Sequence, residues 1–152
     1  MGPDVSVPSV VVIGAGMYVC GRGTDGIGTV LPTLIQAQAD GLISEIAVSA
    51  TSQESVRLLQ EKLRAINRRW GTSGSIRAYP LKGSQSTAYR QALADAPKPA
   101  CAIVAVPDHL HASIASEVIE AGMHVLVVKP LAPTRAEVAR LISQAQARGL
   151  YG

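Results

Sequence analysis

The sequence lacks several features that mark particular classes of protein. It contains no phenylalanine, one tryptophan and two cysteines in 152 residues, and its charged fraction of 16% is below the roughly 25% that is typical of soluble domains. Cys20 and Cys101 lie far apart. Their separation excludes a small disulfide-stapled scaffold and offers no metal-ligand spacing, so we expect no metal site. Every apolar run is shorter than the roughly 18 residues of a membrane span, and we expect no membrane contact.

Aliphatic side chains dominate what is present. Hydrophobic residues make up 47% of the chain, mostly valine, isoleucine, leucine and alanine, and this composition excludes intrinsic disorder. Length and composition favour one domain spanning residues 1–152 with a sizeable core. A net charge of +3 is too mild to indicate nucleic acid, which we do not expect as a partner.

The N-terminal segment does not have the pattern of a secretory signal. No basic region precedes its short apolar stretch, so the expected compartment is the cytoplasm, where both thiols stay reduced. Met1, Gly2 and Ser6 fit a loose myristoylation pattern. A core strand is expected to begin almost directly after them, which makes lipidation the less favoured interpretation.

Apolar strand patterns alternate with helical ones along the whole chain. We expect strands at 10–13, 43–49, 76–79, 101–106 and 125–128. Helices are expected at 28–40, from a capping box at Thr51 to Trp70, at 86–95, at 112–121, and from a second capping box at Thr134 to about Gly149. This alternation predicts an α/β fold with a doubly wound parallel sheet in the strand order 3-2-1-4-5. Ligands of such sheets bind at the carboxyl ends of the strands, near the first and fourth.

A glycine turn follows the first strand. Gly14 and Gly16 permit a tight turn whose N–H groups can approach a pyrophosphate, and we include the next residues, Met17 and Tyr18, among the candidate cofactor contacts. The third glycine of the usual Gly-x-Gly-x-x-Gly pattern is replaced by Val19, and further glycines follow up to Gly28. This long loop is either a flexible insertion or an extended phosphate cradle that presents Arg22 to an anion. We favour the cradle.

The end of the second strand bears on cofactor specificity. Binding of NAD normally uses an acidic residue there, but the chain reads Ala50-Thr51-Ser52. Hydroxyls, helix N–H groups and a cation suit a 2′-phosphate, so Thr51, Ser52 and Arg22 favour NADP, with NAD possible. The alternative for Thr51 is that it only caps its helix.

Two later motifs carry a family resemblance. The segment Val104-Ala-Val-Pro-Asp-His-Leu-His111, and the segment from Glu120 to Lys129-Pro130, resemble the glucose–fructose oxidoreductase/inositol dehydrogenase (Gfo/Idh/MocA) family at matching spacing. The resemblance implies a Rossmann cofactor domain in which Val106, Pro107 and His111 lie against the nicotinamide. It also implies that Lys129 is catalytic and reaches both the nicotinamide and the substrate hydroxyl. The chain departs from the family pattern at Val128, where the family has glutamate.

The resemblance implies hydride transfer on a sugar, polyol or related secondary alcohol. It also implies that the C-terminal substrate domain is absent, so we expect this chain to be inactive alone and to associate with itself through its fifth strand. One alternative is a non-catalytic dinucleotide-binding module, which Val128 would suit. Another is a methyltransferase-like domain for S-adenosylmethionine, which the missing acid after the second strand disfavours. His111 either packs at the start of its helix or transfers a proton.

Overall fold

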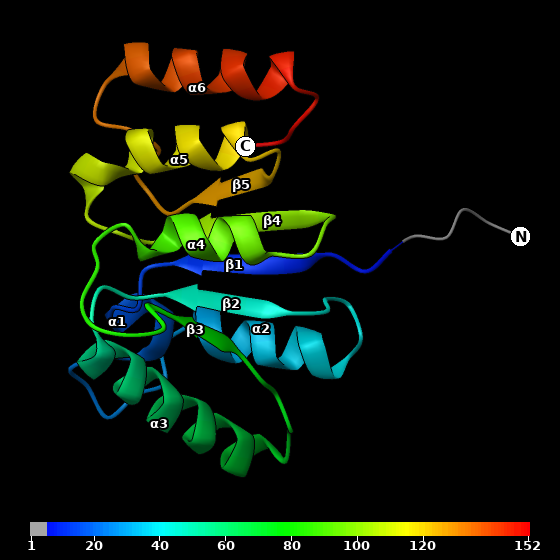
Figure 1. Cartoon of the computed structure of the whole chain (residues 1–152), viewed down its shortest axis with the longest axis vertical. Helices are drawn as coiled ribbons and strands as arrows, with labels where there is room; N and C mark the ends of the chain where they lie inside the picture. The colour runs from blue at the N-terminus through cyan, green and yellow to red at the C-terminus, as the bar shows by residue number, and fades with distance from the viewer. Residues whose placement is uncertain (1–5) are drawn as a thin grey trace, which may run out of the picture.

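The computed structural model describes residues 6–152, so the myristoylation pattern at Gly2 lies outside the described residues. Five parallel strands form one sheet in the order β3-β2-β1-β4-β5, as predicted (Figure 1). The strands are β1 (Ser9–Ile13), β2 (Ile46–Ser49), β3 (Arg77–Tyr79), β4 (Ala100–Val104) and β5 (His124–Val127). Each expected strand is present, with ends that differ by at most three residues from the expected ones.

Helices cover both faces of the sheet, as a doubly wound fold requires. One face carries α1 (Met17–Cys20), α2 (Val30–Ala39) and α3 (Gln53–Trp70). The other carries α4 (Ala88–Asp95) and α5 (His111–Glu120), with α6 (Arg135–Ala147) packed beside α5 (Figure 1). Within residues 6–152, no helix combines the length and the apolar character needed to cross a bilayer.

The central strand β1 is buried on both sides, which explains its continuous β-branched sequence. Val10 and Val12 point into the cluster made with α1, α2 and α3, whereas Val11 and Ile13 point into the cluster made with α4 and α5. Val12 pairs with Val48 of β2 and with Ile103 of β4. The alternation of side chains along β1 therefore joins the two halves of the core.

The strand β5 is less buried than the sequence indicated. Leu126 is 57% exposed, so one face of β5 is not covered by the described residues. On the side away from β4, the Val125 N–H donates to the Tyr151 carbonyl at 2.9 Å. The segment after α6 thus lies beside this edge, and self-association stays a prediction.

The two predicted capping boxes have different outcomes. Thr134 caps α6 as expected, because its Oγ1 accepts from the Glu137 N–H at 3.2 Å and donates to the Glu137 carboxylate. The box at Thr51 is wrong: α3 is capped by Ser52, whose Oγ accepts from the Ser55 N–H at 3.2 Å.

The helix expected at 28–40 is confirmed as α2 (Val30–Ala39), but the short helix α1 before it was not predicted. The chain forms the single turn α1 directly after Gly16, closes it at Gly21, and begins α2 only at Val30. A backbone hydrogen bond from the Thr29 N–H to the Tyr18 carbonyl at 2.8 Å joins the end of the loop to α1. The residues between α1 and α2 are therefore a loop closed on itself.

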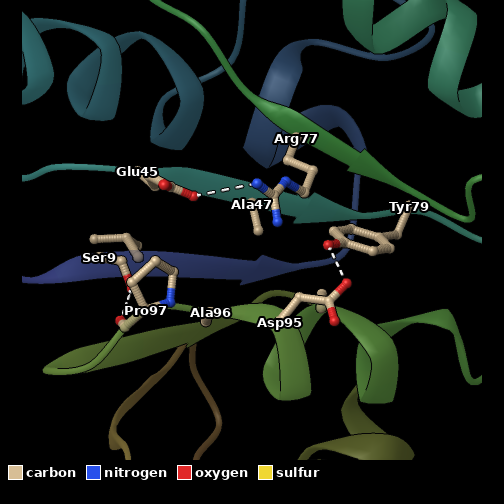
Figure 2. A pocket seen from close by; sticks show the side chains of 10 residues that line it. Ser9, Glu45, Ala47, Arg77, Tyr79, Asp95, Ala96 and Pro97 are labelled. Atoms are coloured by element: carbon tan, nitrogen blue, oxygen red, sulfur yellow. Dashed lines mark hydrogen bonds and ion pairs between the residues drawn. The ribbon is translucent and has the colours of Figure 1, made fainter.

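Side chains close the amino-terminal edge of the sheet (Figure 2). The Tyr79 hydroxyl donates to Asp95 at 2.7 Å, and Arg77 pairs with Glu45 at 3.6 Å. A cavity of only about 10 Å³ lies among them, which is space for about one water molecule. This cavity is too small for a ligand larger than water.

Removal of the Tyr79 hydroxyl should change the titration of Asp95. Hydrogen bonds from Tyr79 and then from Gln91 hold the pKa of the Asp95 carboxyl below its ordinary value. A lowered carboxyl pKa stabilises the fold above the unfolded-state pKa, and this contribution is lost as the pH falls through the folded-state pKa. In Tyr79→Phe we expect the Asp95 pKa to rise and the fold to lose less stability on acidification. Carboxyl NMR titration measures this, with Tyr151→Phe as control, and an unchanged Asp95 pKa would contradict it.

Candidate functional site

A cavity of about 370 Å³ opens at the carboxyl ends of β1, β2 and β4. It is the place where ligands of doubly wound sheets bind. Six of the candidate residues line it: Gly14, Gly16, Arg22, Thr51, Val106 and Pro107. The remaining lining residues were not singled out from the sequence and are Ile13, Ala15, Ser49, Ala50, Ser55, Ser86, Tyr89, Ala105, Leu110 and Ile114.

The two glycines of the turn have different reasons to be glycine. At Gly14, φ is +115° and a Cβ would lie 2.1 Å from the Ala105 carbonyl oxygen, so the fold itself requires glycine. Gly16 has an extended backbone that any residue adopts, and a Cβ there would meet no protein atom within 4 Å. Packing within the chain therefore gives no reason for glycine at position 16. The open space in front of it belongs to the cavity.

The glycine-rich loop presents Arg22 to this cavity. The loop is held by internal bonds: the Thr24 N–H and Oγ1 both donate to the Gly21 carbonyl, at 3.0 and 2.9 Å. Gly21 lies so close to Gly26 that a Cβ would come within 2.2 Å of the Gly26 oxygen. These contacts show a folded loop rather than a flexible insertion, and its role as a phosphate cradle stays a prediction.

A second cavity of about 280 Å³ continues from the first along α3. We call it the annex. The two share Arg22 and Ser55, and the annex is completed by Glu54, Arg57, Leu58 and Glu61. Two cations and two carboxylates face it, so it combines a site for an anion with acceptors for N–H or O–H groups.

The α3 cap lies one residue later than predicted, so the Thr51 side chain is free to face the cavity. Because Ser52 caps α3, the Thr51 side chain does not have that role, and Thr51 is exposed on the cavity wall. Its carbonyl accepts from the Gln85 N–H at 2.9 Å, which fixes its backbone against the loop after β3. The capping explanation for Thr51 is thereby removed, whereas Ser52 is occupied by capping and does not line the cavity.

Tyr89 forms part of the cavity wall and is fixed from behind. Its hydroxyl donates to Glu117 at 2.8 Å, and Arg90 donates two hydrogen bonds to the same carboxylate at 2.7 and 3.0 Å. Burial and the bond to Glu117 raise the pKa of the Tyr89 hydroxyl, so it stays a donor at neutral pH. No local sequence signal marks Tyr89. Ser49 could have been found from its position at the end of β2, whereas Ser86 lies in the loop after β3.

His111 is fully buried behind the cavity. Its Nε2 lies 2.8 Å from the Val106 carbonyl oxygen and its Nδ1 lies 2.5 Å from that of Pro130. Both partners are acceptors in the backbone, so His111 links the turn after β4 to the turn after β5. It does not line the cavity, and this position supports a packing role at the start of α5 over proton transfer.

The other candidate residues lie around the cavity rather than in its wall. Met17 and Tyr18 are 65% and 54% exposed on α1. Lys129 is exposed at the carboxyl end of β5, followed by a cis bond to Pro130. Lys129 is thus at the correct edge of the sheet, next to the turn that His111 holds.

The cavity has the chemistry of a dinucleotide site. Backbone N–H groups near an open glycine, serine and threonine hydroxyls and one guanidinium can bind phosphates and ribose, while the apolar surface of Val106, Leu110 and Ile114 suits a planar ring. Comparison with known proteins agrees. The model of the GFO_IDH_MocA oxidoreductase family, described as an NAD-binding Rossmann fold, matches residues 9–151. This chain belongs to that family.

The chain is similar to part of a curated dehydrogenase and, in fold, to solved structures of a dehydrogenase and a ketoreductase. Inositol 2-dehydrogenase 1 of Saccharopolyspora erythraea is 45% identical over 47 residues, which cover 31% of this chain and 14% of that protein. The WlbA dehydrogenase from Bordetella pertussis, in complex with NADH and UDP-GlcNAcA, aligns with a TM-score of 0.57 at 22% identity, covering 94% of this chain and 34% of its own. KijD10, a 3-ketoreductase from Actinomadura kijaniata in complex with NADP and TDP-benzene, gives 0.58 and 24%, covering 94% and 35%. The chain thus spans about a third of these solved structures.

Replacement of Gly14 and of Gly16 by alanine should affect two different properties, the first fold stability and the second dinucleotide affinity. In Gly14→Ala, the strained φ and the clash with Ala105 should lower the free energy of unfolding by about 2–4 kcal/mol. In Gly16→Ala, that free energy should change by less than about 1 kcal/mol, while dinucleotide affinity should fall about tenfold as the added methyl enters the cavity. Denaturant unfolding and dinucleotide titration measure the two effects. Unchanged affinity in Gly16→Ala would show that no ligand approaches this glycine.

Replacement of His111 by leucine should destabilise the fold. The variant keeps a similar volume but removes both ring contacts, of which a neutral ring can make one as an N–H donor. One buried carbonyl therefore loses its donor, at a cost of about 1–3 kcal/mol. Denaturant unfolding tests this, with the exposed His109→Leu as the matched control. Equal stabilities of the two variants would mean that the ring contacts contribute nothing measurable.

Proposed function

We propose that this chain binds NADP, with NAD as the weaker ligand, and forms the cofactor-binding part of an oxidoreductase that acts on a sugar, polyol or related secondary alcohol. The observation that carries the proposal is the open space in front of Gly16, where packing among residues 6–152 does not require glycine. Pyrophosphate is the group for which such a glycine leaves room. A bound nicotinamide would supply the hydride acceptor or donor.

The preference for NADP is supported by the residues around Arg22. The strand β2 is followed by Ala50, Thr51 and Ser52, so no carboxylate is present to bind a ribose 2′-hydroxyl or repel a 2′-phosphate. Thr51 and Arg22 both line the cavity, and Arg57 faces the adjoining annex. Among the described hydrogen bonds and ion pairs, none uses the Arg22 guanidinium, which leaves it available for an anion. A charge-assisted bond to phosphate is the strongest contact that it can make there.

For the nicotinamide half, we propose that Pro107 and Val106 form the wall behind the ring. His111 would hold this wall and the turn at Pro130 in a fixed relation through its two backbone contacts. Lys129 would reach the substrate hydroxyl from the next strand end and polarise it or take its proton. The remaining substrate contacts would come from other parts of the whole enzyme.

A second candidate is a dinucleotide-binding module without catalysis. The observation in its favour is Val128, which stands beside Lys129 where the family resemblance has glutamate. Without that carboxylate, the described residues next to Lys129 provide no acidic partner on the same turn. Both candidates predict dinucleotide binding, and hydride transfer by the whole protein distinguishes them.

The test is a titration of the chain with NADPH and with NADH, followed by nicotinamide fluorescence. We expect saturable binding that is about tenfold tighter for NADPH, and loss of that preference in Arg22→Gln, because the preference corresponds to about 1.4 kcal/mol from one charged contact. Arg140→Gln on α6 removes the same charge far from the cavity and is the control. Tighter binding of NADH would overturn the NADP assignment, and binding of neither would overturn the proposed function.

A further inference from the structure

One lysine joins the glycine-rich loop to α3. Lys62 lies in the third turn of α3, and its Nζ donates to the Thr24 carbonyl at 2.8 Å and to the Gly26 carbonyl at 2.5 Å. Among the described residues, these are the side-chain hydrogen bonds that connect the loop to this helix. The lysine is only partly buried, so its position is set by these contacts and not by a surrounding core.

The loop that Lys62 holds has one compact backbone arrangement. Gly21 lies against Gly26, and Gly28 lies against the backbone of Val19, where a Cβ would meet atoms at 2.6 Å. The Thr24 hydroxyl accepts from the Gly26 N–H at 3.1 Å and so closes the tip. These contacts are internal to the loop. They fix its shape. Its placement relative to α3 depends on the packing of Ile27 against the core cluster and on the two hydrogen bonds of Lys62.

That placement decides where Arg22 lies. Arg22 belongs to the loop, whereas the annex that it faces is otherwise built from α3 residues, including Ser55, Arg57 and Leu58. Both Lys62 and Arg22 act on one nearby group: burial raises the pKa of the Cys20 thiol, and the charges of Lys62 and Arg22 partly oppose this rise. Lys62, on α3, and Arg22, on the loop, are therefore both near the short helix α1.

We propose that Lys62 is a positioning residue that holds the glycine-rich loop against α3 and so sets Arg22 for the phosphate-bearing ribose of the dinucleotide. The inference rests on the proposed function for the identity of the ligand but not for the contact itself. Lys62 acts through the loop backbone, because both of its hydrogen bonds are made to carbonyl groups. An ammonium group with these two acceptors cannot at the same time bind a phosphate in the annex as freely as Arg22 can.

The experiment compares Lys62→Met with Arg64→Met. Arg64 is on the same helix and exposed, so its variant removes one positive charge from α3 without touching the loop. Hydrogen exchange of the amides from Arg22 to Thr29 is measured on the ligand-free chain, and NADPH and NADH are titrated into each variant. Lys62→Arg, which keeps donors on a long side chain, tests for rescue.

We expect faster amide exchange in the loop of Lys62→Met only. Its NADPH affinity should fall about tenfold, which corresponds to a loop that adopts the binding-competent arrangement about a tenth of the time. NADH affinity should fall less, and Lys62→Arg should recover most of the loss. Unchanged loop exchange in Lys62→Met, or equal losses in Lys62→Met and Arg64→Met, would overturn the proposal. If the unaltered chain binds no dinucleotide, the proposed function fails, while the exchange measurement still decides whether Lys62 holds the loop.

Discussion

The close approach of Gly14 to the end of β4 is the contact on which the site depends. A side chain at this position would meet the Ala105 carbonyl, and the Gly14 N–H donates to the Ser49 carbonyl at 2.9 Å. One glycine thus touches the ends of both neighbouring strands. Because β1, β2 and β4 are held together at this point, the chain can turn away after Gly14 and leave a cavity between them. Bulk at Gly14 would separate the strand ends, and with them the residues that line the cavity.

The sheet could be predicted from the sequence because its signals are local and agree with one another. The strands β1, β4 and β5 are short apolar runs with glycine or proline close to both ends, and the alternation with helices leaves few possible topologies. Thr51 and Thr134 show where local signals stop being sufficient. Both precede a glutamate by three residues, but only Thr134 is a cap, because the loop after β3 pairs with the chain at Ser52 and Gln85 bonds to the Thr51 carbonyl. The spacing is identical, and tertiary contacts decide between the two outcomes.

Site residues divide in the same way. Gly14, Gly16, Thr51 and Pro107 could be found because they directly follow strands, and in a parallel sheet all such positions meet at one edge. Tyr89 is a helix residue, and its place in the wall depends on Glu117, which follows it by 28 residues. Leu126 was expected to be buried but is exposed, because an apolar run at the edge of a sheet has the same sequence pattern as one in the centre. The burial of a residue depends on which other elements pack against it, and a single sequence gives only indirect information about that packing.

The two halves of the cavity are held by different kinds of contact, and this has a consequence for cofactor choice. On the side of β4 and β5, His111 is fully buried and its contacts do not compete with water, so that half is rigid. On the side of α3, the loop is held by a partly exposed lysine, and Arg22 is exposed. Hydrogen bonds in contact with water contribute less and break more easily. The wall nearest the proposed nicotinamide position is therefore the fixed part. In the proposed function, Arg22 and the loop discriminate between the dinucleotides. A change in the loop or in α3 would then alter cofactor preference while the rest of the fold stays as it is.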